Sequence, residues 1–209
     1  MVLSKISKME TKTSLYENFE FEQTYHLFTR VSGNELIFRK EGNYDYFLRQ
    51  LSKYLLPYLE IYAYCLVPQR FSLLICFRSK NEIFKHFDLP ENEMSAEQEH
   101  KFLMQPISNL LNSYSKAYNK MFQRKGALFI DYIKRERIDE EGQLKNIFKD
   151  IHHIPLQHQF VKSSDEWKYS SFNAYLNANK STKVSKNFML GFFENTQDLI
   201  QFHKIIQTL

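Results

Sequence analysis

Three closely spaced histidines are the first residues of this sequence whose type could do chemistry. His152, His153 and His158 carry imidazole nitrogens, which are common ligands of metal ions. On a helix, however, adjacent residues point about 100° apart, and Pro155 interrupts the segment. We therefore interpret the three histidines as partly exposed or helix-capping residues and favour this over a metal site.

A second candidate site lies between two apolar runs, residues 61–67 and 71–77. Both runs are rich in aromatic and branched side chains and are too short for helices, so they predict two central strands. Side chains alternate between the two faces of a strand, so Arg70 and Ser72 share one face while Phe71 points into the opposite layer. This spacing of two residues could build a polar site on the sheet.

The segment 63–75 that contains these residues reads A-Y-C-L-V-P-Q-R-F-S-L-L-I. It resembles the A-Y-C-L-M-P-N-H-F-H-L-L stretch of the single-tyrosine transposases of the HUH superfamily, in particular the REP-associated tyrosine transposases. In that family the two histidines hold a divalent metal ion against the scissile phosphate of single-stranded DNA. Arg70 and Ser72 stand at those two positions here.

The resemblance extends over roughly residues 20 to 176, with the motifs in order and at the family's spacing. The close of this region, W-x-x-S-S-x-x-x-Y-L in the family, is matched from Trp167 to Leu176. Several independent short matches are harder to explain by chance than one. The other matching segments are residues 25–30, 35–38, 43–48, 112–120, 124–129 and 151–155.

The resemblance implies that the catalytic residues of the family are absent. The nucleophilic tyrosine falls on Asp150, and the further metal ligand four residues later falls on Ile154. A guanidinium such as that of Arg70 stays protonated and offers no lone pair to a metal. Ser72 alone is too weak a ligand, and attack by Asp150 would lack the metal that polarises the phosphate. We predict no metal cofactor and no cleavage of the family type, so that the protein is not an active enzyme.

A cluster of basic residues suggests a nucleic-acid surface. Seven cations between residues 116 and 137, against only Asp131 and Glu136, predict a basic strip that Arg70 would extend. Such a strip could contact phosphates, with Tyr114, Tyr118 and Phe122 available for base stacking. In the alternative interpretation the lysines are a solvated helix face and the tyrosines are core. The seven residues are Lys116, Lys120, Arg124, Lys125, Lys134, Arg135 and Arg137.

Composition indicates an ordinary cytoplasmic protein. The 209 residues carry 28 Lys and Arg against 24 Asp and Glu, a net charge of +4 that by itself identifies no partner. No run approaches the roughly 18 apolar residues of a membrane span, and residues 1–12 are too polar for a secretory signal. Cys65 and Cys76 lie in apolar strand-like runs, which favours buried reduced thiols over a disulfide or a metal pair.

The element order predicts an α+β domain of the ferredoxin-like class, which is also the fold that the resemblance implies. Apolar residues at three- and four-residue steps predict a helix from Tyr44 to Tyr58, with Pro57 in its last turn. A polar loop is expected at residues 79–99, a long helix at 102–123, and a last strand at 127–138. Two helices should pack on one face of an antiparallel sheet.

We divide the chain into three parts. Residues 1–18 are expected to form a flexible arm, residues 19–160 the transposase-like domain, and residues 161–209 a helical extension. The extension should contain a small helix near Tyr175 and a final helical hairpin, built from residues 188–193 and from Phe202, Ile205 and Ile206.

The favoured function is a catalytically inactive, transposase-like protein that binds single-stranded or hairpin DNA. Two alternatives stay open: an active DNA strand-cleaving enzyme with an atypical nucleophile, and a domesticated scaffold that binds RNA or protein. We expect no membrane association and keep a homodimer as a candidate assembly.

Overall fold

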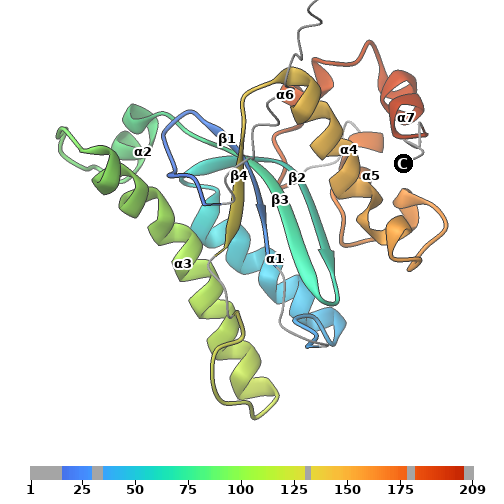
Figure 1. The fold of residues 1–209 in the computed structure, drawn as a ribbon, viewed down its shortest axis with the longest axis horizontal. Coiled ribbons are helices and arrows are strands. Elements are labelled where there is room, and N and C mark those ends of the chain that lie inside the picture. The colour runs from blue at the N-terminus through green and yellow to red at the C-terminus, as the bar shows by residue number, and fades with distance from the viewer. Residues whose placement is uncertain (1–15, 30–34, 130–132, 178–181, 205–209) are drawn as a thin grey trace, which may run out of the picture.

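The computed structural model of this chain describes residues 16–29, 35–129, 133–177 and 182–204 (Figure 1). The expected arm is described only from Tyr16, which forms an isolated bridge with Arg135. The elements are β1 (Thr24–Phe28), α1 (Glu41–Leu55), β2 (Leu59–Val67), β3 (Arg70–Phe77), α2 (Lys80–His86), α3 (Ala96–Met121), β4 (Lys134–Ile138), α4 (Glu141–Gln157), the 3-10 helix η1 (Ser164–Glu166), α5 (Phe172–Leu176), α6 (Lys186–Leu190) and α7 (Thr196–Lys204).

Four strands form one antiparallel sheet in the order β2-β3-β1-β4. Each of the two inner strands, β3 and β1, is paired on both sides, and Phe28 of β1 lies opposite Ser72 of β3. This order is that of a ferredoxin-like sheet, and the predicted α+β class is confirmed.

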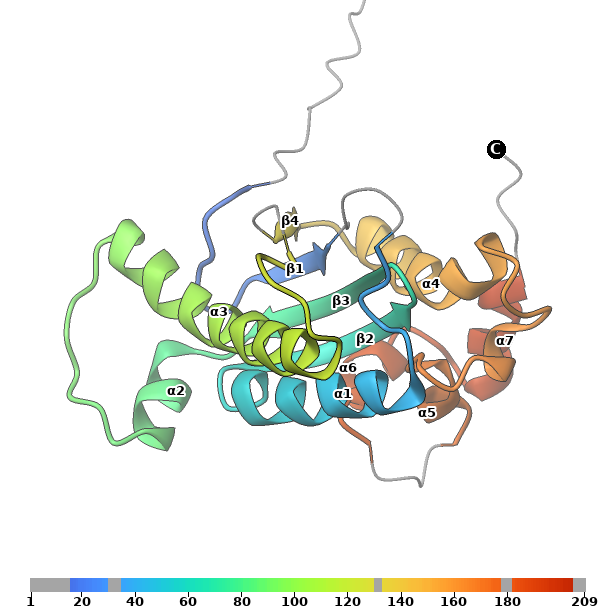
Figure 2. The same cartoon turned by 90° about the horizontal axis from the view of Figure 1, so that it is seen from below.

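Helices α1 and α3 cover one face of the sheet, and α4 lies over the other (Figure 2). Phe71 is fully buried on the face of α1 and α3, where its ring centroid lies 5.0 Å from that of Phe47 in α1. Phe47 in turn contacts Tyr114 of α3, with centroids 5.2 Å apart. The strand alternation therefore sends Arg70 and Ser72 to the α4 face, as predicted.

Two capping boxes place helices where the sequence pattern suggested a loop. Ser79 and Ser95 each accept a hydrogen bond from the backbone N–H three residues later, and the side-chain oxygens of Glu82 and Gln98 accept one from the N–H of the cap residue. These caps satisfy N–H groups that a helix start leaves unpaired. Helix α2 therefore forms inside the expected loop, and α3 begins at residue 96 rather than 102.

Two other element boundaries also differ from expectation. Helix α1 ends at Leu55, before Pro57, because a proline offers no N–H to continue the helical hydrogen bonds. The last strand is shorter than predicted: β4 begins at Lys134, and Leu128 is buried in the core outside any strand. Residues 130–132 of the expected strand lie outside the described residues.

The C-terminal extension packs on the α4 side and on the free edge of β2. Leu66 donates its N–H to the Tyr169 carbonyl (3.0 Å), and Ser171 donates to the Tyr64 carbonyl (2.9 Å). Helices α6 and α7 occupy the region of the expected hairpin, whereas its residues Ile205 and Ile206 lie outside the described residues. Within the described part of the chain, no helix is both long enough and apolar enough to cross a membrane.

Candidate nucleic-acid site

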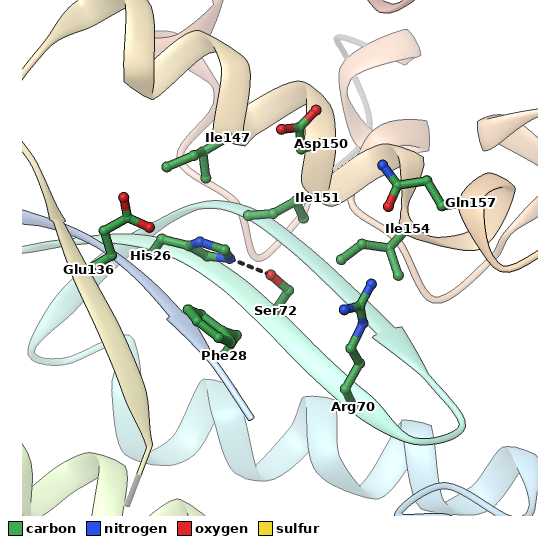
Figure 3. A pocket seen from close by; sticks show the side chains of 10 residues that line it. All are labelled: His26, Phe28, Arg70, Ser72, Glu136, Ile147, Asp150, Ile151, Ile154 and Gln157. Atoms are coloured by element: carbon green, nitrogen blue, oxygen red, sulfur yellow. Dashed lines mark hydrogen bonds between the residues drawn. The ribbon is translucent and has the colours of Figure 1, made fainter. Parts of the chain in front are cut away.

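A cavity of about 370 Å³ lies between the sheet and helix α4 (Figure 3). All four residues that match the catalytic positions of the resembling family line this cavity: Arg70 and Ser72 from β3, and Asp150 and Ile154 from α4. Residues 150 and 154 are one helical turn apart and so share a face of α4. The structure thus brings together four positions that are up to 84 residues apart in the chain.

The cavity has a cationic end and an acidic end. Arg70 stands at the end next to the turn between β2 and β3, and Glu136 and His26 stand at the opposite end (Figure 3). Glu136 of β4 accepts a hydrogen bond from Gln143 of α4 at 2.9 Å. A phosphate would therefore be attracted to the Arg70 end, while Glu136 and Asp150 would repel it from the remainder.

His26 is a site residue that sequence reasoning missed. Its Nε2 lies 2.7 Å from the Ser72 hydroxyl, across the pair of strands β1 and β3. Burial, assisted by the positive charge of Arg70, lowers the pKa of His26 to about 4, so its ring is neutral at pH 7. The strand register that joins His26 to Ser72 leaves no signal in the linear sequence.

The residues of this cavity do not fit the divalent metal of the resembling family. Arg70 brings a permanent positive charge, Ile154 offers no donor atom, and the Ser72 oxygen is already engaged by His26. Among the residues that the structure describes, no group of three His, Cys, Asp or Glu side chains is arranged to hold a metal ion. The loss of the family's metal stays a prediction that solution experiments must test.

The expected basic strip is divided by the fold. Lys116 and Lys120 lie exposed on α3, on the side of the sheet away from Arg70, and Lys125 is exposed just beyond the end of that helix. Arg124 pairs with Glu35 (3.4 Å), and Arg137 pairs with Glu20 and Asp139 (2.9 and 2.7 Å). Of the seven cations, Lys134 is the one whose strand register places it on the face of Arg70, because it lies opposite Phe28 of the cavity.

Arg135 was expected to contact phosphates, and this prediction is wrong because the residue is only 6% exposed. Its guanidinium donates to the carbonyls of Tyr16 (3.1 Å) and Glu17, and its carbon atom lies 4.9 Å from the ring centroid of Phe19. These contacts tie the segment before β1 to the helix-covered side of the sheet. Arg135 is therefore a structural residue, and we do not retain it as a phosphate contact.

The aromatic residues expected to stack on bases are also mostly buried. Tyr114 and Tyr118 are 1% and 2% exposed, and their hydroxyls donate to the carbonyls of Ile37 and Leu36. Phe122 is half-buried against Tyr118 and lies under the Arg39 guanidinium. The alternative interpretation of the two tyrosines as core is correct, because their hydroxyls find backbone partners inside the protein.

The three histidines near the end of α4 have different environments. His158 is exposed at the C-cap and His153 is half-buried, as expected. His152 is instead fully buried between the Ser171 hydroxyl (2.7 Å from Nε2) and His203 of α7 (3.0 Å from Nδ1). A buried imidazole needs a partner for each nitrogen, and only the docking of the C-terminal extension supplies both.

The cysteines are free thiols in the described structure. Cys65 is buried, and its burial raises the pKa of the thiol well above its usual range. Cys76 is half-buried rather than fully buried.

Among solved structures, a REP-associated tyrosine transposase bound to a REP hairpin is similar to this chain. The two share a TM-score of 0.56 and 13% sequence identity, over 83% of this chain and 92% of that one. No protein-family model matches the sequence. No curated protein matches it either. The chain has the fold of a REP-associated tyrosine transposase, which confirms the fold implied by the motifs between residues 20 and 176.

Proposed function

We propose that this chain, built on the transposase fold, binds single-stranded or hairpin DNA at the cavity between the sheet and α4 and does not cut it. The observation that carries the proposal is the position of Arg70. Its guanidinium enters the cavity beside Ser72, Asp150 and Ile154, the positions that match the metal ligands and nucleophile of the resembling family.

An arginine in this place favours holding a phosphate over activating it. A guanidinium neutralises phosphate charge and donates two parallel hydrogen bonds, but it cannot generate or polarise a nucleophile as a metal ion does. Asp150 adds a negative charge where the family has its tyrosine, which would repel a scissile phosphate. The solved structure with the similar fold holds a REP hairpin, which supports hairpin DNA as the first ligand to test.

We expect Arg70→Ala to weaken binding of a DNA hairpin that carries a single-stranded tail, by about tenfold at low salt. The measurement is fluorescence anisotropy of the labelled hairpin across a salt series, with duplex and unstructured strands for comparison. Loss of one phosphate contact should reduce the slope of log affinity against log salt by about 0.7 to 0.9.

Arg49→Ala is the matched control for this experiment. Arg49 is an exposed arginine on α1, on the opposite face of the sheet, where it lies over the Tyr46 ring. Equal affinity losses for the two variants would mean that Arg70 acts only through net charge. Binding no tighter than about 10⁻⁴ to 10⁻⁶ M for every DNA would refute the DNA-holding role. A preference for RNA of matched structure would instead favour the scaffold alternative.

The second part of the proposal predicts that the tailed hairpin stays intact in the presence of Mg²⁺ or Mn²⁺. The cavity lacks both the metal ligands and the tyrosine that the family chemistry requires. Denaturing gel electrophoresis of end-labelled hairpin, after prolonged incubation with excess protein, measures this directly. A metal-dependent product that disappears in Asp150→Ala would establish an active strand-cleaving enzyme with a carboxylate nucleophile.

A further inference from the structure

A three-ring aromatic stack lies on the surface beside the Arg70 end of the cavity. The ring of Phe160 lies nearly parallel to those of His158 and Trp167, with centroids 5.7 and 5.5 Å away and interplanar angles of 15° and 24°. His158 is close enough to Arg70 for its charge to lower the histidine's pKa further, after the larger effect of burial. The lowered pKa favours the neutral imidazole, which stacks as an aromatic ring.

The backbone holds Phe160 at the surface in a fixed position. Gln159 adopts a left-handed conformation (φ 56°) after α4, and its N–H donates to the Leu156 carbonyl at 2.9 Å. The next N–H, that of Phe160, donates to the Pro155 carbonyl at 2.9 Å. These two bonds form a Schellman motif, which terminates α4 and orients the following residue. Phe160 remains 44% exposed.

The other end of the stack is attached to the strand that leads to Arg70. Trp167 donates its indole N–H to the Leu66 carbonyl at 2.8 Å, near the end of β2. Val67, the next residue, pairs with Arg70 across the β2–β3 turn. Gln157 lines the cavity and directly precedes His158 in the chain. The end of α4 and the end of β2 thus hold the aromatic stack next to the Arg70 end of the cavity.

We propose that the surface formed by His158, Phe160 and Trp167 stacks the bases of a single-stranded DNA segment whose phosphate is held by Arg70. Exposed aromatic rings beside a cationic group are typical of surfaces that bind single-stranded nucleic acid. Each base can stack on an aromatic ring, and each phosphate carries a negative charge that attracts the cation. This inference rests on the proposed DNA binding. The single-stranded part of the ligand would then lie at the C-terminal end of α4. The surface of His158, Phe160 and Trp167 takes the stacking role that the sequence had suggested for the tyrosines of α3, which are buried.

The test compares one DNA hairpin in three forms: blunt, with a single-stranded tail, and with a tail of abasic residues that keeps the phosphates. Wild-type protein should bind the tailed hairpin about tenfold more tightly than the blunt or abasic forms. Phe160→Ala should lose that tenfold gain and keep its affinity for the blunt hairpin. Phe160→Tyr, which preserves a stacking ring, should restore the gain.

Phe188→Ala is the matched control, because Phe188 is also a stacked and exposed phenylalanine. It is 46% exposed and lies 4.6 Å from the ring of Tyr62, which is in the first half of β2. This variant should bind all three hairpins as the wild type does.

Trp167 is the single tryptophan of the chain, so its fluorescence reports on the stack itself. Saturable quenching by the tailed hairpin, but not by the abasic form, is expected.

The outcomes separate this inference from the function on which it rests. If Phe160→Ala keeps the full tail-dependent gain, or if abasic and ordinary tails bind alike, the stacking surface is refuted and hairpin binding by Arg70 stands. If the wild type binds none of the hairpins, the proposed function and the stacking surface are both refuted.

Discussion

The free energy of unfolding is expected to fall by several kcal/mol as the pH is lowered from 6.5 to 5, before most carboxylates titrate. Three buried histidines cause this sensitivity. Burial lowers the pKa of His26 and of His203 to about 4, and it lowers the pKa of His152 well below its usual range. His26 and His203 should each remove about 2 kcal/mol of stability by pH 5, and His152 acts in the same direction.

The pair formed by His152 and His203 explains why a proton is disfavoured there. The Leu199 carbonyl can only accept, so His203 donates from Nδ1 (2.9 Å) and its Nε2 accepts from Nδ1 of His152 (3.0 Å). Nε2 of His152 then accepts from the Ser171 hydroxyl (2.7 Å). A further proton on Nε2 of His203 would break the hydrogen bond from His152 and would bury a charge near Lys149 and His153.

The direction of the effect follows from proton binding. The folded-state pKa of each histidine lies below the value of 6.5 expected in the unfolded chain. Between the two values the unfolded state binds more protons, so stability rises with pH. The stability that depends on these neutral histidines is fully present above about pH 6.5 and is lost progressively as the pH falls toward 4.

Urea unfolding at half-unit pH steps measures this dependence. His203→Leu should be less stable than the wild type at pH 7.5, because His152 loses a partner, and should show a shallower decline toward pH 5. His86→Gln, which changes an exposed histidine of α2, should reproduce the wild-type curve. A free energy of unfolding that stays constant between pH 6.5 and 5 would contradict the buried neutral histidines.

Neighbouring cations of β4 are expected to give opposite phenotypes. Arg135→Ala should lower the free energy of unfolding by about 2–4 kcal/mol, because the carbonyls of Tyr16 and Glu17 lose their donor and Phe19 loses its cation. Its hairpin affinity should be unchanged. Lys134→Ala should keep its stability and weaken hairpin binding by about threefold to tenfold at low salt.

The physical reason is strand alternation. Lys134 lies opposite Phe28 on the cavity face, and Arg135 lies opposite Leu27 on the face covered by α1 and α3. Denaturant unfolding and anisotropy binding on the same two preparations provide the comparison, and each variant controls for the other. If the Arg135→Ala variant folds stably but binds DNA more weakly, Arg135 contacts the DNA and the structural role assigned to it is wrong.

The sheet shows how local signals can suffice for part of a fold. Apolar runs on both sides of residues 68–70 predicted β2 and β3, and alternation placed Phe71 in the core and Arg70 on the other face. The alternation of side chains along a strand is set by backbone geometry alone, so it can be predicted without knowing which other segments pack against the strand. The same holds for the amphipathic pattern of α1 and of most of α3, whereas the helix starts set by the capping boxes at Ser79 and Ser95 were missed, and with them the whole of α2.

The basic residues show where linear reasoning stops. Lys116, Lys134 and Arg135 are close in sequence or alike in charge, yet the structure puts them on the outer side of α3, on the cavity face and in the interior. Charge identifies a side chain that can bind phosphate, but not the side of a sheet on which it ends. The same ambiguity made Tyr114 and Tyr118 look available for stacking.

By itself, the sequence determined the class of fold, the strand pair that carries Arg70, and the absence of histidine and tyrosine from the matched motif positions. Those features depend on residue identity and on periodicity, which are local. The tertiary structure showed that Asp150 and Ile154 line one cavity with Arg70, as the resemblance implied, and it alone decided that His26 binds Ser72 and that His152 is buried against His203. These contacts join distant segments through strand register and helix packing, and only the folded chain specifies the distances between them.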